Sequence, residues 1–109
     1  QFGGGVCSDG AGGALAGFVQ NVGSGVENWY AQRVVAAGTR QWGDNGVVVD
    51  AAGSSHNGGG VLPDGTGGAF MMFGRVSGTI DLYAQRLNSD GVAQWTTNGV
   101  PVCTATNNQ

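Results

Sequence analysis

The stretch DGTGGAFMMF at positions 64–73 repeats, with substitutions, the stretch DGAGGALAGF at positions 9–18, and this repetition decides the fold. The two stretches are 55 residues apart. Each begins with an Asp-Gly turn signal and runs into a short apolar segment, which is typical of a turn that leads into a β-strand. Further matches follow at a spacing of 53 residues: YAQR at 30–33 and 83–86, QW at 41–42 and 94–95, and NGV at 45–47 and 98–100. The chain is therefore two copies of one unit, which we place at residues 1–53 and 54–109.

Each copy carries signals for four short strands separated by glycine-rich turns. In the first copy the expected strands cover residues 3–7, 13–20, 28–35 and 41–49. The second-copy run at 69–73 is apolar on both faces, whereas a sheet that covers a core with one face alternates apolar and polar residues. We therefore expect an all-β fold of two four-stranded antiparallel propeller blades, each packed between neighbours, with the glycine-rich strand innermost.

Two blades cannot close a ring, so the sequence predicts that further blades complete it. Within the chain, the step from Gly46 to Gly58 takes 12 residues, and head-to-tail placement of two chains would join Gly99 to the next Gly3 across 13. Repeat units that cannot bury both faces alone need stacked neighbours. We expect completion by a homo-oligomer of three or four copies, as a ring or an open filament, or by neighbouring repeats of a longer array.

Composition excludes several classes of function. The 109 residues include 23 Gly and no Lys, and four Arg against seven acidic residues give a net charge of −3. No basic patch is present to neutralise phosphates, so we expect no nucleic-acid partner. No apolar run approaches the roughly 18 residues of a membrane span. The low charge favours an extracellular or cell-surface location, and the first residue, Gln1, indicates a processed or excised chain.

Residues that could carry chemistry are few. Asp9, Asp64 and Asp90 each precede Gly, but they lack the alternating acidic spacing of a calcium loop, so we interpret them as turn residues. His56 is the only His, and its polar loop predicts a solvated side chain. We expect no catalytic residue, no metal site and no cofactor, and therefore no enzyme.

The residues that recur in both copies are expected to be structural: Tyr30, Gln32, Arg33 and Trp42, with Tyr83, Gln85, Arg86 and Trp95. A repeated Arg in a strand favours pairing with a repeated acid or a backbone carbonyl over anion binding. Cys7 and Cys103 are expected to remain unbonded, because the blade order places them on opposite edges, beyond the roughly 7 Å that a disulfide allows.

Trp29, Glu27 and Asn28 do not recur, and they leave two interpretations open. An exposed Trp29 beside an acid and an amide could stack on a sugar ring and hydrogen-bond its hydroxyls. The competing interpretation, which we favour, is that Trp29 fills the space between blades.

The combined motifs, DGxGGA, YAQR, QW and NGV, resemble a family of bacterial secreted and surface proteins with tandem propeller-like repeats. The resemblance extends over nearly the whole chain, twice, and it implies a β-propeller without general enzymatic activity. The sequence therefore supports two functions. One is a lectin-like, carbohydrate-binding propeller module assembled from two-blade chains, and the other is a structural, self-assembling repeat protein without a small-molecule ligand.

Overall fold

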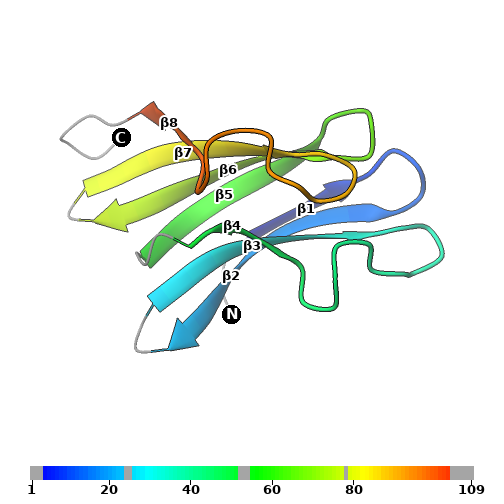
Figure 1. The fold of residues 1–109 in the computed structure, drawn as a ribbon, viewed down its shortest axis with the longest axis horizontal. Coiled ribbons are helices and arrows are strands. Elements are labelled where there is room, and N and C mark those ends of the chain that lie inside the picture. Colours follow the sequence, from blue (N-terminus) through cyan, green and yellow to red (C-terminus); the bar gives the residue numbers. More distant parts are fainter. Residues whose placement is uncertain (1–3, 24–25, 52–54, 78, 104–109) are drawn as a thin grey trace.

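The computed structural model of the chain is all-β, and it describes residues 4–23, 26–51, 55–77 and 79–103. The first sheet contains β1 (Gly4–Ser8), β2 (Ala14–Gly23), β3 (Val26–Val34) and β4 (Val47–Asp50). The second contains β5 (Ser55–Pro63), β6 (Ala69–Ser77), β7 (Thr79–Leu87) and β8 (Val100–Cys103). Consecutive strands are antiparallel neighbours in both sheets (Figure 1). The expectation of an all-β chain with two four-stranded antiparallel sheets is confirmed.

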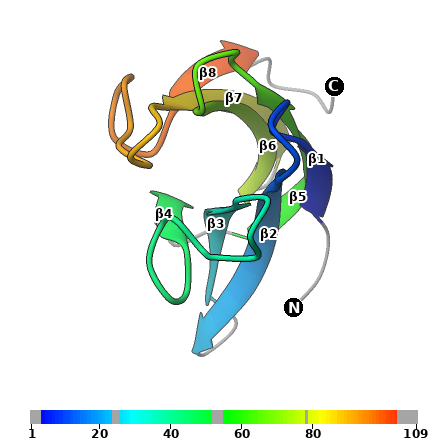
Figure 2. The same cartoon turned by 90° about the vertical axis from the view of Figure 1, so that its right-hand side faces the viewer.

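The two sheets pack against each other, and the glycine-rich strands β1 and β5 lie side by side (Figure 2). The core between the sheets consists of apolar side chains from both repeats: Leu15, Val19, Trp29, Ala31, Trp42 and Val49 from the first, and Val61, Ala69, Met71, Phe73 and Leu87 from the second. No helix long and apolar enough to cross a membrane occurs among the described residues.

Strand alternation gives each sheet two distinct faces. We call the face that carries Leu15, Gly17 and Trp29 the front face of the first sheet; it packs on the second sheet. The corresponding front face of the second sheet carries Phe70, Met72 and Leu82. The opposite, back faces carry Ala16 and Phe18 in the first sheet and Met71 and Phe73 in the second. The front face of the first sheet thus packs on the back face of the second.

The fourth strand is shorter than the sequence predicts. It begins at Val47 instead of residue 41, and residues 41–46 form an irregular arch with two bends. The side chain of Gln32 holds this arch: its Nε2 donates to the carbonyl of Gly43 at 2.7 Å, and its Oε1 accepts from the Trp42 N–H at 2.9 Å. Gly43 and Gly46 have φ of 82° and 85°, values that disfavour a regular strand.

The second repeat builds the same arch. Gln85 donates to the carbonyl of Thr96 at 2.9 Å and accepts from the Trp95 N–H at 2.9 Å. The recurring Gln of YAQR and the recurring Trp of QW are therefore hydrogen-bonded to each other in both repeats, and together they form what we call the glutamine arch. In both repeats the glutamine therefore fixes the backbone of the tryptophan.

Candidate functional site

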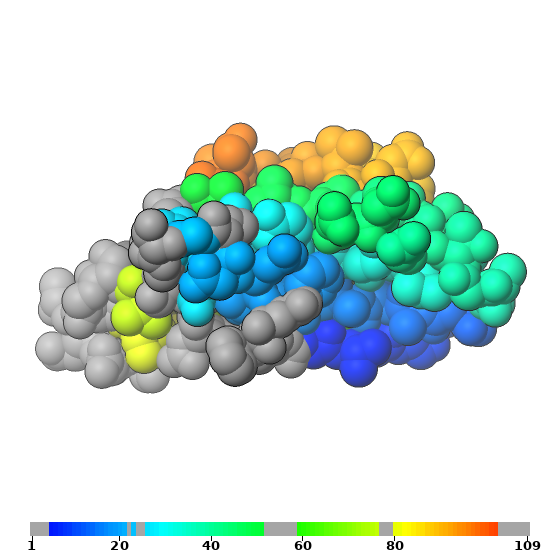
Figure 3. Space-filling model, turned by 90° about the horizontal axis from the view of Figure 1, so that it is seen from below, coloured from blue at the N-terminus to red at the C-terminus, as the bar shows by residue number. Residues whose placement is uncertain are grey.

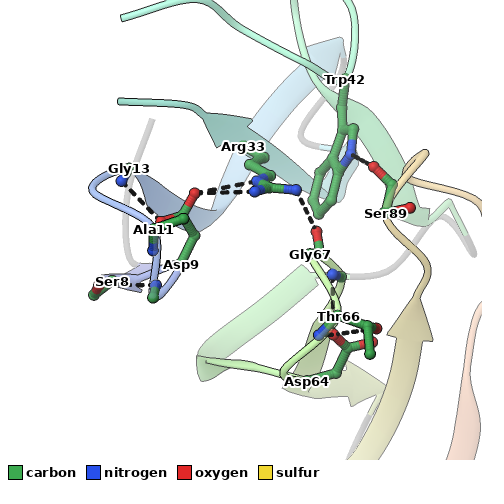
Figure 4. Close-up of polar contacts among 12 residues, drawn as sticks. Ser8, Asp9, Ala11, Gly13, Arg33, Trp42, Asp64, Thr66, Gly67 and Ser89 are labelled. Carbon is green, nitrogen blue, oxygen red and sulfur yellow. Dashed lines mark hydrogen bonds and ion pairs between the residues drawn. The ribbon is translucent and has the colours of Figure 1, made fainter. Parts of the chain in front are cut away.

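Asp9 organises the turn between β1 and β2 and binds the repeated arginine. Its Oδ1 accepts from the N–H groups of Ala11 and Gly13, both at 2.8 Å, and its Oδ2 accepts from Arg33 Nε and Nη2, both at 3.2 Å (Figure 4). The backbone N–H of Ala11, followed by that of Gly13 and by Arg33, lowers the pKa of Asp9. The carboxylate is thus a turn residue and an arginine partner.

Asp64 does the same in the second repeat. Its Oδ1 accepts from the N–H groups of Thr66 at 2.8 Å and Gly68 at 3.0 Å, and its Oδ2 accepts from Arg86 Nη2 at 3.2 Å. These bonds, the one from the Thr66 N–H above all, lower the pKa of Asp64 to about 2. The interpretation of Asp9 and Asp64 as turn residues, and of both repeated arginines as partners of a repeated acid, is confirmed.

Arg33 and Trp42 also reach across to the second sheet. Arg33 Nη1 donates to the carbonyl of Gly67 at 2.9 Å, and Trp42 Nε1 donates to the carbonyl of Ser89 at 3.0 Å (Figure 4). Trp42 is only 3% exposed. The side chains of Arg33 and Trp42 therefore hydrogen-bond the backbone of the second repeat and so join the two sheets.

A buried ion pair that the sequence did not predict also joins the sheets. Arg75 Nε and Nη2 contact the two carboxylate oxygens of Asp50 at 3.1 and 3.0 Å, and Nη2 also donates to the carbonyl of Asn98 at 3.0 Å. The guanidinium lies 3.7 Å from the ring centre of Tyr83. Neither charge recurs at the equivalent position of the other repeat. The signal in the sequence that could have indicated this pair is that Asp50 and Arg75 are opposite charges found in one repeat only.

Trp29 lies in the interior, so the first of its two interpretations is wrong as stated. Its side chain is fully buried and stacks on Phe73, with ring centres 6.1 Å apart. A buried indole cannot offer its face to a sugar, and Trp29 fills the space between the sheets. Glu27 and Asn28 are half-buried on β3, where they pair in register with Asn21 and Gln20. The three residues do not form one open surface.

The other repeated residues lie within and beside the core. Gln32 and Gln85 are buried. Tyr30 stacks on Phe18 with ring centres 5.8 Å apart, and Tyr83 stacks on Phe73 at 6.1 Å. Trp95 differs from its equivalent Trp42, because it is 40% exposed.

The front face of the second sheet is open and apolar. It forms a groove of about 750 Å³. Its lining includes Leu62, Phe70, Met72, Leu82 and Trp95. A smaller hollow of about 450 Å³ lies on the back face of the first sheet and includes Ala16, Phe18 and Gln20. Figure 3 views the molecule from the side of the first sheet, where residues of β1 to β4 and their connections form much of the surface.

Cys7 is a free thiol on β1, so it forms no disulfide. Cys103 lies on β8 of the other sheet, and its side chain lies outside the described residues. Burial raises the pKa of the Cys7 thiol. The side chain of His56 lies outside the described residues. Among those that are described, no group of three or more His, Cys, Asp or Glu is arranged to hold a metal ion.

Comparison with protein-family models, with curated proteins and with solved structures gives no match for this chain. The functional argument therefore rests on the geometry of the two sheets and on the repeated motifs.

Proposed function

We propose that the chain is a pair of β-propeller blades, a non-enzymatic repeat module that assembles with further blades into a larger scaffold. One observation carries this proposal: the second sheet presents an open copy of the face that the first sheet buries. In this view the two four-stranded meanders are blades, and the interface between them is one joint of a longer stack.

The equivalent positions of the two front faces differ in exposure and share apolar character. Leu15 and Trp42 are buried in the first sheet, whereas their equivalents Phe70 and Trp95 are 39% and 40% exposed. Met72, which corresponds to Gly17, is 45% exposed. Exposed apolar groups that are contiguous and rimmed by polar residues mark interaction sites on soluble proteins. The open front face is a continuous apolar surface, which supports its being covered by a further blade.

Carbohydrate binding, the other function that the sequence suggested, is less well supported. Its proposed stacking residue, Trp29, is buried between the two sheets and stacks on Phe73. A tryptophan buried between two sheets agrees with the assembly function, in which such side chains fill the space between neighbouring blades.

Light scattering on the purified chain tests the proposal. We expect a folded species whose mass is a multiple of 10.9 kDa, with three copies giving six blades and four giving eight. Electron microscopy then separates closed rings from filaments. A well-folded species of 10.9 kDa that persists at all chain concentrations would refute the proposal.

A further inference from the structure

We infer that the open front face of the second sheet is the docking site for a second copy of this chain, which places the back face of its first sheet there. The contact repeats the register of the interface inside the chain. This inference rests on the proposed function and adds the partner, the face and the residue pairs.

The first observation is an exchange of large and small residues at the centre of the interface. Inside the chain, Gly17 faces Met71 so closely that a Cβ on Gly17 would lie 2.5 Å from Met71 Cε. The equivalent pair between copies is Met72 on the front face and Ala16 on the back face. Inside the chain the front face carries the small residue and the back face the large one, whereas between copies the front face carries the large residue and the back face the small one. Close packing requires this kind of compensation.

The second observation concerns the indoles. Inside the chain, Trp42 covers Gly91, where a Cβ would lie 2.8 Å from the ring, and its Nε1 donates to the carbonyl of Ser89. The equivalents between copies are Trp95, Gly38 and Ala36. Trp95 is partly exposed, and no neighbouring atom lies within 4 Å of a Cβ placed on Gly38. The back face of the first sheet therefore has room for the indole that the second sheet exposes.

The third observation concerns the arginines. The side chain of Arg33 is 16% exposed and donates across to the carbonyl of Gly67. The side chain of Arg86 binds Asp64 in the same way and is 40% exposed. Its equivalent acceptor is the carbonyl of Gly12 in the next copy. That single bond would give Arg86 the same kinds of hydrogen-bond partner that Arg33 has, a turn carboxylate and a backbone carbonyl of the next sheet.

The buried ion pair fixes which faces meet. At the positions equivalent to Asp50 and Arg75 stand Cys103 and Gln20. A second copy that placed Gln20 against Asp50 would bury that carboxylate without its arginine, which is costly. Placed against the second sheet, Gln20 meets a position that carries no charge. The first sheet therefore keeps its covalent neighbour, and the second sheet accepts the copy.

An exchange of the central pair tests the inference. Ala16→Met alone should place two methionines opposite each other and reduce the assembled mass to that of one chain. Met72→Gly alone should leave a void and weaken assembly. The double variant Ala16→Met/Met72→Gly reproduces the internal pair in its original order and should recover assembly. Ala11→Met, in an exposed turn, is the matched control and should assemble like the parent.

Light scattering on the four variants separates the outcomes, with circular dichroism reporting the sheet content of each. Loss of assembly in Ala16→Met with recovery in the double variant supports the inference. If the parent assembles and Ala16→Met assembles equally well, or the double variant stays dissociated, the docking register is wrong while the proposed function stands. A parent that never assembles overturns both.

Discussion

The two sheets are built from one sequence repeat, yet one has a covered front face and the other an open one. Trp42 is buried and hydrogen-bonded to the next sheet, whereas Trp95, held by the same glutamine arch, is partly exposed. The glutamine arch is formed in both repeats. The difference is that a following sheet covers the front face of the first sheet only. In the first repeat, Arg33 and Trp42 hydrogen-bond the backbone of the following sheet, so part of their contacts depends on that neighbour.

The residues that do not recur complete the comparison. Asp50 and Arg75 join the two sheets through charge, and the equivalent positions, Cys103 and Gln20, carry none. Trp29 stacks on Phe73 inside the chain, and the equivalent pair is Leu82 with Phe18. The interface inside the chain thus depends on residues that occur in one repeat only.

The tryptophans give the largest expected effect. Trp42→Ala should lower the free energy of unfolding by about 4 kcal/mol, because it empties a packed site and removes a hydrogen bond to Ser89. This loss should be the same at every chain concentration. Trp95→Ala should cost more as the concentration rises, because the proposed docking covers this partly exposed indole with a second copy. Urea unfolding at several concentrations measures both, and parallel behaviour of the two variants would break the comparison.

The buried ion pair comes next. Arg75→Met should lower the free energy of unfolding by about 3 kcal/mol, since it leaves Asp50 buried without its arginine. The matched control is Arg40→Met, which removes an exposed pair with Asp44 at 3.8 Å and should cost less than about 1 kcal/mol. Urea unfolding compares the two variants. Equal losses of unfolding free energy would show that the Asp50–Arg75 pair stabilises the fold no more than an exposed pair does.

The repeated arginines should differ by a smaller amount. Arg33→Ala and Arg86→Ala should both lower the melting temperature, because each removes the partner of a turn carboxylate. Arg33→Ala should cost more at low concentration, since it also loses the bond to Gly67. The difference should shrink as copies assemble. Calorimetry at two concentrations measures it, and unchanged melting of both variants with loss of a ligand would reassign the arginines to binding.

Acid should produce the smallest effect. The pKa of Asp64 is lowered to about 2, from an unfolded value of about 3.9. A carboxylate with a depressed pKa contributes stability that is present above the unfolded pKa and is lost as the pH falls through the folded one. The melting temperature should therefore fall between about pH 4 and pH 2. Asp64→Asn should flatten this fall, and calorimetry across this pH range measures it.

The sequence predicts the recurring parts of this molecule well. The Asp-Gly turns, the four strands of each repeat and the Asp–Arg pairing follow from motifs that occur twice. The start of β4 was mispredicted because Gln32, which is distant in sequence, hydrogen-bonds residues 41–46 into an arch. The Asp50–Arg75 pair was also beyond reach, since it depends on how one sheet sits on the other. Trp29, in contrast, lies between the sheets, as the favoured interpretation of the sequence had it.

Oxidation of the two methionines tests the central claim most directly. Met71 and Met72 are adjacent on β6 and point to opposite faces, with 1% and 45% exposure in the single chain. The parent protein is treated with dilute peroxide at a concentration where it is assembled, and peptide fragmentation resolves the two sulfoxides. If further blades cover the open front face, Met72 is oxidised as slowly as Met71. Rapid oxidation of Met72 beside an intact Met71 would show that the face stays uncovered and would contradict the account.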